Sequence, residues 1–242
     1  MRTLGKSAVL NARDEITQLP LDVCNSESVG AAVDAAIAAA GHLDIVVNNA
    51  GIEVFGAVHL LSDEEVMRQL DTNVVGVIRV VRAVVPHMLA AGGGTIVTVG
   101  SLAGLVGPPY SGIYAASKHA VEALSEAMHF ELSQQGIKVR VVEPGQFATE
   151  LGSNSIYAAA MTAETPERQR YERFRTAMRS LVDGTPPSAQ IVADAIYAAA
   201  TDEPGHLRHP VGDDASLVIA VKSQMSFEDF DQAMRTTLNW FE

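Results

Sequence analysis

Apolar residues along this chain recur in two alternating patterns. Short β-branched runs predict buried strands, at residues 15–23, 43–48, 95–99, 137–142 and 206–211. Longer stretches with helical character lie between them, at residues 26–40, 62–91, 112–135 and 188–200. Strand and helix therefore follow each other through most of the sequence, which indicates an α/β protein.

Polar residues and glycines mark the expected ends of these helices. Ser26 is placed to cap the first helix, and Gly41 ends it. Ser62 and Glu65 have the spacing of a capping box at the start of the long second helix. Three consecutive glycines end that helix, and Ser226 is placed to cap the last helix of the chain.

The predicted strands are almost continuously apolar, which is typical of a parallel sheet covered by helices on both faces. We therefore expect a doubly wound parallel sheet. The chain has 242 residues, 48% of them hydrophobic, and we find no repeat or linker that divides it. This is the size of a single domain over residues 1–242.

Ligands of such sheets bind beyond the carboxyl ends of the strands. Three of the predicted strand ends are polar or rich in glycine: residues 48–51, Gly100 with Ser101, and Pro144 with Gly145. The candidate site is therefore expected at this edge of the sheet.

Charge and composition exclude several classes of function. A formal net charge of -12 gives no general attraction for phosphate backbones or anionic membranes, so neither is an expected partner. The single cysteine excludes an internal disulfide, and His206 and His209 have no acidic or thiol cluster around them, so we expect no metal site. We find no signal peptide and no apolar run long enough to span a membrane, which predicts a cytoplasmic protein.

The sharpest chemical pattern is the pair Tyr114 and Lys118, four residues apart on a predicted helix. Residues at this spacing share a helix face. The ammonium would favour the phenolate and lower the pKa of Tyr114, so that the tyrosine could exchange a proton with a carbonyl or alcohol oxygen. Taken alone, the pair could equally be an amphipathic tyrosine and a solvated lysine on a surface helix.

Two further polar residues accompany this pair. Ser101 follows a strand end and could hold a substrate oxygen against Tyr114, or it could cap a turn. Asn73 lies inside the long second helix, where asparagine is a mediocre residue. It could serve the site or bond a local carbonyl group.

Together these residues resemble the short-chain dehydrogenase/reductase family, in its branch of single-domain enzymes. The family's order and spacing are matched by Ser101 and by the motifs NNAG at 48–51, DTNVVG at 71–76, YAASK at 114–118 and PGQFAT at 144–149. The resemblance covers essentially the whole chain and is nearest to the group with 17β-hydroxysteroid and retinol dehydrogenases. It implies a Rossmann-like fold and an NAD(P)-dependent oxidoreductase that interconverts a ketone or aldehyde and the alcohol of an apolar small molecule.

The resemblance also implies roles for the four candidate catalytic residues. Tyr114 would be the general acid/base, and Lys118 would lower its pKa and bond the nicotinamide ribose. Ser101 would position the reacting oxygen, and Asn73 would hold a water in a proton relay to Lys118. The cofactor would supply the hydride.

The resemblance assigns a second set of residues to cofactor binding. Asp22 would bond the adenine amino group, and Val23 would pack beside the ring. The adenosine ribose would be bordered by three residues of the NNAG motif, Asn48, Ala50 and Gly51. The nicotinamide would be lined by Pro144, Gly145 and Thr149. Arg2, at the place where such enzymes choose between the two dinucleotides, favours NADP over NAD.

The sequence departs from the family at its N-terminus, where no glycine-rich phosphate loop precedes Asp22. A strand, loop, helix and strand unit is expected to be missing, which leaves the strand at 15–23 without a partner and the strand at 43–48 as an open apolar edge. We expect that the start codon is assigned too late. The alternative is a cofactor-free binding or regulatory protein on a degraded scaffold of this family.

Residues 151–182 are expected to form an insertion that covers the substrate, as in the family. Its larger side chains could line an apolar pocket or form an ordinary helix core: Tyr157, Met161, Tyr171, Phe174 and Met178. The helices at 63–91 and 112–135 carry apolar residues around much of their surface. This favours a homodimer or homotetramer in which these helices pair with their copies.

Overall fold

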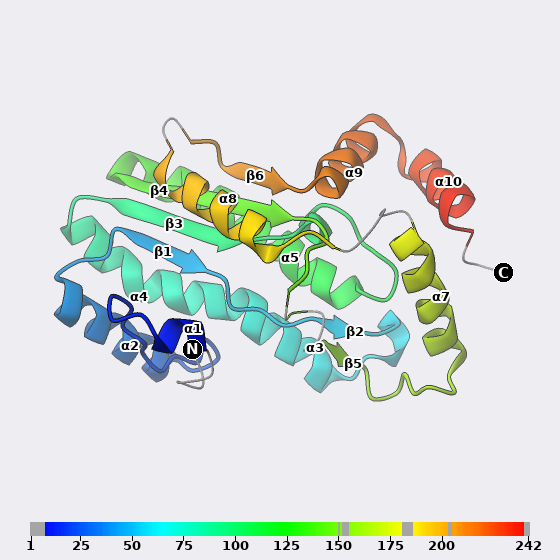
Figure 1. Ribbon diagram of the computed structural model, residues 1–242, viewed down its shortest axis with the longest axis horizontal. Helices are drawn as coiled ribbons and strands as arrows, with labels where there is room; N and C mark the ends of the chain where they lie inside the picture. The colour runs from blue at the N-terminus through cyan, green and yellow to red at the C-terminus, as the bar shows by residue number, and fades with distance from the viewer. Residues whose placement is uncertain (1–7, 150, 152–154, 181–185, 203–204, 240–242) are drawn as a thin grey trace.

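The computed structural model describes residues 8–149, 151, 155–180, 186–202 and 205–239. Its centre is a sheet of four parallel strands in the order β1-β3-β4-β6 (Figure 1). These strands are β1 (Ile45–Asn48), β3 (Gly94–Val99), β4 (Ile137–Pro144) and β6 (Arg208–Val211). The parallel α/β sheet predicted from the alternating pattern is thereby confirmed.

Helices cover both faces of this sheet. One face carries α2 (Ser26–Ala40), α4 (Gly76–Ala90) and α5 (Gly112–Leu132), and the other carries α8 (Ala189–Thr201). Neighbouring residues of a strand point to opposite faces. Ile96 accordingly packs in a core cluster with Val84 of α4, whereas Val97 packs with Ala199 of α8.

A small second sheet lies at the end toward which the main strands point, where β2 (Val54–Phe55) pairs with β5 (Ile156–Tyr157) (Figure 1). The other elements are α1 (Ala8–Asn11), η1 (Val58–Leu60), α3 (Asp63–Leu70), η2 (Asp71–Val75), η3 (Leu102–Gly104), η4 (Ser133–Gln135), α7 (Pro166–Ser180), α9 (Asp213–Gln224) and α10 (Phe227–Leu238). Because β5 and α7 belong to the insertion expected at 151–182, that insertion lies at the carboxyl end of the sheet.

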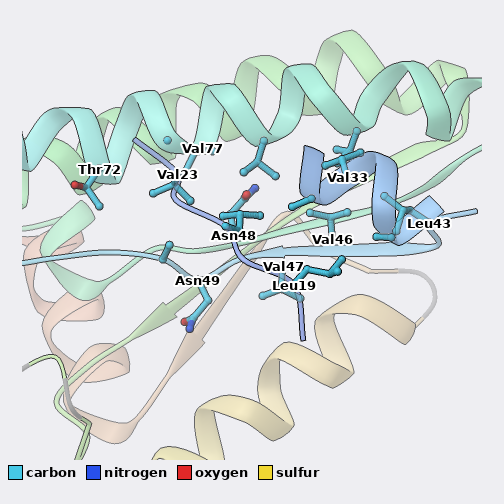
Figure 2. A pocket seen from close by; sticks show the side chains of 17 residues that line it. Leu19, Val23, Val33, Leu43, Val46, Val47, Asn48, Asn49, Thr72 and Val77 are labelled. Carbon is cyan, nitrogen blue, oxygen red and sulfur yellow. The ribbon is translucent and has the colours of Figure 1, made fainter. Parts of the chain in front are cut away.

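The predicted strand at 15–23 is wrong, because no strand forms there. A strand needs a neighbour for its backbone N–H and C=O groups, and β1 has no partner beyond it among the described residues. A cavity of about 270 Å³ lies in this place, lined by Leu19, Val47 and other apolar side chains (Figure 2). The open edge is real, since Ile45 and Val47 are 42% and 41% exposed.

Several details of the other elements differ from the prediction. Asn25, and not Ser26, caps α2, because its side chain accepts a hydrogen bond from the Ser28 N–H. The β4 strand continues to Pro144. The long second helix is interrupted by η2, a π-helical turn in which the Gly76 N–H donates to the Asp71 carbonyl oxygen.

By length and composition, the 28 residues of Asp63–Ala90 could cross a membrane, so the expectation that no segment could do so is wrong by that criterion. In this fold, one side of the segment packs against the main sheet. Val84 and Met88 are buried against the sheet, and the ion pair of Arg79 with Asp71 lies at its middle, with 2.7 Å between Nη2 and Oδ1.

Candidate active site

Three of the four predicted catalytic residues meet at the carboxyl end of β3. Ser101 lies two residues beyond the end of β3, while Tyr114 and Lys118 lie on the first turns of α5. The Ser101 hydroxyl lies close enough to the Tyr114 phenol to lower its pKa through hydrogen bonding. The Lys118 Nζ atom lies 5.7 Å from the centroid of the Tyr114 ring. The helical spacing and the strand end therefore bring together the hydroxyl, phenol and ammonium groups predicted from the sequence.

The electrostatics of Tyr114 differ from the prediction. Burial raises its pKa, the negative charge of Glu53 raises it further, and only the bond with Ser101 acts in the opposite direction. The expected lowering by Lys118 is not seen in this arrangement. Burial lowers the pKa of Lys118 to about 8, against the opposing charges of Glu122 and Glu53. The Lys118 Nζ donates to the Val99 carbonyl oxygen at 2.7 Å.

Asn73 is buried in the π-helical turn. Its side chain links the segment before β2 to α5, the catalytic helix that carries Tyr114 and Lys118. Its Oδ1 accepts from the Ile52 N–H at 2.9 Å, and its Nδ2 donates to the Ile52 carbonyl oxygen at 3.0 Å. The same Nδ2 lies 3.1 Å from Ser117 Oγ, which in turn donates to the Tyr114 carbonyl oxygen at 2.6 Å. The side-chain amide thus fixes the backbone on both sides of the site. The role of holding a water stays a prediction.

Glu53 is a residue at this site that our sequence analysis missed. Ser111 Oγ donates to its Oε1 at 3.3 Å, and Glu53 acts electrostatically on both Tyr114 and Lys118. Burial raises the pKa of Glu53 to about 7. The available signal was a single acid in the apolar run 52–55, directly after the NNAG motif and a strand end.

The residues expected around adenosine lie together near the open edge of the sheet. Val23, Asn48 and Ala50 line the cavity beside β1 (Figure 2), and Gly51 lies beside the Asn73 amide. Asp22 forms a local turn instead, in which its Oδ1 accepts from the Cys24 N–H at 3.0 Å.

The residues expected around the nicotinamide follow β4. Pro144 is the last residue of that strand, and Gly145 lies against the carboxylate of Asp214, so that a Cβ at this position would clash with it. Thr149 is exposed in the loop beyond. Arg2 lies outside the described residues.

A dinucleotide fits one part of this site better than the other. The buried Lys118 ammonium, the Tyr114 phenol and the Ser101 hydroxyl are the polar groups that a nicotinamide ribose and a reacting oxygen need. A pyrophosphate is usually held by free N–H groups at a helix N-terminus. The α2 N-terminus, which follows the cavity-lining Val23 along the chain, is capped by Asn25 and carries Glu27 in its first turn. The described residues therefore offer no pyrophosphate cradle there.

The insertion forms a packed aromatic cluster around the second sheet. The Phe55 and Tyr171 ring centroids are 5.1 Å apart, and those of Tyr110 and Tyr171 are 5.6 Å apart. Of the five side chains expected to line a pocket, Met161, Tyr171 and Phe174 are fully buried. These three are core residues of the insertion, the second of the two possibilities that the sequence left open.

Comparison with known proteins agrees with this geometry. Residues 4–158 match the family model described as short chain dehydrogenase. An uncharacterized oxidoreductase of Schizosaccharomyces pombe is 31% identical over 234 residues, which cover 95% of this chain and 96% of that protein. The chain belongs to the short-chain dehydrogenase family. A 3-ketodihydrosphingosine reductase of Bacteroides thetaiotaomicron is 43% identical over 140 residues, covering 58% of this chain and 52% of that protein.

Solved structures of this family have the same fold. A short-chain dehydrogenase of Streptomyces avermitilis matches with a TM-score of 0.74 and 30% identity, over 95% of this chain and 83% of that one. One from Burkholderia phymatum in complex with NAD matches with a TM-score of 0.72 and 28% identity, covering 90% and 77%. A gluconate 5-dehydrogenase of Burkholderia cenocepacia in complex with NADP and tartrate has a TM-score of 0.65 and 26% identity, covering 82% and 74%. Similar short-chain dehydrogenases thus bind NAD or NADP, and the chain is an oxidoreductase of that family.

Proposed function

We propose that the protein interconverts a ketone or aldehyde and the corresponding alcohol of an apolar small molecule, with Tyr114 as general acid/base. The observation that carries this proposal is the convergence of Ser101, Tyr114 and Lys118 at the carboxyl end of β3. A hydroxyl beside a phenol at a strand end offers a substrate oxygen two groups that it can contact together.

Each side chain has a part that follows from its contacts. Ser101 orients the reacting oxygen, because its hydroxyl lies beside the Tyr114 phenol. Tyr114 carries its proton at neutral pH, since burial and Glu53 raise its pKa, and it is therefore set to donate that proton to a carbonyl oxygen. Lys118 provides the positive charge beside the ring and would hold the ribose of the dinucleotide. The dinucleotide, when bound, supplies or accepts the hydride.

For the cofactor we propose NADP, with NAD as the alternative. Arg2 can grip a 2′-phosphate through two parallel hydrogen bonds, and Lys6 follows it closely. The test measures kcat/KM with NADPH and with NADH, on the wild type and on Arg2→Ala. A preference for NADH, or an NADPH preference that survives Arg2→Ala, overturns this choice.

A second candidate function is a cofactor-free binding or regulatory protein, which the capped N-terminus of α2 favours. Titration calorimetry with NADPH separates the two. Saturable binding of NADPH supports the enzyme. The second candidate is supported if NADPH binds neither to this chain nor to a chain extended by the codons upstream of Met1.

The test of the enzyme is turnover over a panel of ketones, aldehydes and alcohols with both dinucleotides. Tyr114→Phe removes the phenol with little change in shape, and we expect a loss of at least about a hundredfold in kcat, in line with general acid catalysis. Tyr197→Phe is the matched control, because Tyr197 is 72% exposed on α8. Full turnover by Tyr114→Phe would show that the proposed mechanism is wrong.

The remaining expectations are proposals of the same kind. We propose a cytoplasmic protein that acts on a small molecule, with no nucleic acid or membrane as partner, and that assembles as a homodimer or homotetramer. The acidic net charge of -12 supports the absence of nucleic acid and anionic membranes as partners.

A further inference from the structure

Glu53 is held in place from three directions. Gln69, which is fully buried, accepts from the Val54 N–H at 2.8 Å and donates to the Ile52 carbonyl oxygen at 2.8 Å. Asn73 binds both backbone groups of Ile52. The Glu53 carbonyl oxygen itself accepts from the Ile156 N–H at 2.9 Å. The backbone of this acid is therefore fixed between the catalytic core and the insertion.

The side chain of Glu53 is directed to the start of the catalytic helix. Ser111, which is 6% exposed and immediately precedes α5, donates to Glu53 Oε1. Among the described residues this is the only hydrogen bond to that carboxylate, which can accept about four. The group thus keeps most of its capacity for a ligand that donates hydrogen bonds.

Aromatic rings lie beside this acid. Phe55 follows two residues later and packs with Tyr171, and the charge of Glu53 also acts on Tyr171. The same cluster already stacks a cation, because the Arg168 guanidinium lies 3.6 Å from the centroid of the Tyr157 ring. A carboxylate next to aromatic faces is the combination that binds ammonium groups.

Lys118 alone does not compensate the negative charge of the Glu53 carboxylate. The Lys118 ammonium donates to the Val99 carbonyl oxygen, and the charge of Glu122 acts on it more strongly than that of Glu53. Glu53 is half-buried, and a carboxylate withdrawn from water is costly unless a positive group or several hydrogen bonds compensate it. A positive group on the substrate can supply this compensation.

We propose that Glu53 binds an ammonium group on the substrate, next to the carbon that reacts at Tyr114, so that the protein acts on amino ketones and amino alcohols. This inference rests on the proposed function. Glu53 would then be a specificity residue, while Ser101, Tyr114 and Lys118 carry the chemistry.

The experiment compares two stable probes of equal size, 2-amino-1-phenylethanol and 1-phenyl-1,2-ethanediol, which differ in one ammonium or hydroxyl group. Binding by titration calorimetry is measured for the wild type, Glu53→Gln and Glu131→Gln, an exposed acid on the same helix as Tyr114. We expect the wild type and Glu131→Gln to prefer the amino alcohol by about tenfold or more, as charged hydrogen bonds would give. Glu53→Gln should abolish that preference.

Two further variants keep the result decisive. Glu53→Asp retains the charge on a shorter arm and should keep part of the preference. If Glu53→Gln does not fold, Ser111→Ala and the wild-type comparison of the two probes decide instead. Equal binding of the probes by the wild type, or a preference that survives Glu53→Gln, overturns the inference.

Turnover of the same probes separates this inference from the proposed function. Tyr114→Phe should lose turnover and keep the binding preference. A binding preference without turnover in any variant refutes the enzyme and leaves the ammonium site. Turnover that depends on Tyr114 but does not distinguish the probes refutes the ammonium site and leaves the enzyme.

Discussion

The carboxyl groups of Glu122 on α5 and Glu143 on β4 lie side by side in the interior, 5% and 1% exposed. The Arg208 Nε atom approaches both, at 3.0 Å from Glu122 Oε2 and 3.5 Å from Glu143 Oε1. Burial raises the pKa of both acids, and the charge of Glu122 helps to raise that of Glu143 to about 7. Two neighbouring buried acids with one guanidinium favour a shared proton.

This pair predicts that stability declines as the pH rises toward neutrality. The folded pKa of Glu143, about 7, lies above the value of 4.5 expected for an unfolded chain. Its contribution is therefore complete below pH 4.5 and is lost as the pH rises through about 7. We expect the melting temperature of the wild type to fall between these values, and that of Glu143→Gln to fall less. Glu131→Gln should behave as the wild type, and identical slopes for all three proteins would contradict the assignment.

The Asn73 amide predicts a large effect of a small substitution. Asn73→Ala leaves the buried N–H of Ile52 without its acceptor and removes two donated bonds. An unsatisfied buried group costs about 1–3 kcal/mol, so the free energy of unfolding should fall by about that amount in urea titrations. Gln232→Ala, an exposed amide on α10, is the control and should change stability by less than about 0.5 kcal/mol. A loss no larger than that of the control would show that the bridge is not stabilising.

Exposed apolar residues on the helix surface support the prediction of a dimer or tetramer. Phe130 on α5 is 78% exposed and Leu89 on α4 is 38% exposed, both on the helices expected to pair with their copies. Sedimentation velocity at micromolar concentration should show a dimer or larger species, and Phe130→Glu should shift it toward monomer. Phe227→Glu on α10, where the side chain is 75% exposed, is the matched control. A monomeric wild type would refute this prediction.

The side of β1 that pairs with no strand among the described residues predicts association of a different kind. Its backbone groups and the exposed Val47 can pair with a strand of another chain. We expect Val47→Lys to reduce slow aggregation, followed by light scattering at elevated concentration. Val58→Lys, at a residue 74% exposed in η1, should not. Equal aggregation of the two variants would exclude β1 as the route.

The parts of the fold that depend on local chemistry were predictable from the sequence. Ser62 and Glu65 form the expected capping box, and Gly41 ends α2 with a φ of 86°. The parallel strands were also predictable, because buried strands require continuous apolar runs. The segment at 15–23 was not, since its apolar pattern is that of a strand, whereas a strand also needs a hydrogen-bonding neighbour and none pairs with it among the described residues.

The candidate site shows the same division. Tyr114 and Lys118 share a helix face by spacing alone. The reason for Asn73 could not be found that way, because its partners Ile52 and Ser117 lie 21 and 44 residues distant along the chain. The pKa of Tyr114 depends on burial and on Glu53, and neither can be inferred from a motif.

The π-helical turn at η2 corrects the phase of a long helix. Gln69 and Met88 are both fully buried and stand 19 residues apart. In an ideal helix that separation ends roughly 100° beyond five turns, which would rotate one of the two side chains out of the interior. A π turn takes up about one extra residue, and the remaining 18 residues make roughly five whole turns. Gln69 and Met88 therefore lie on one straight stripe of side chains along the helix. Gln69 binds the Glu53 segment, and Met88 packs against the main sheet. Inserting a single residue beside this turn would rotate one half of the helix against the other by about 100° and set the two ends out of step.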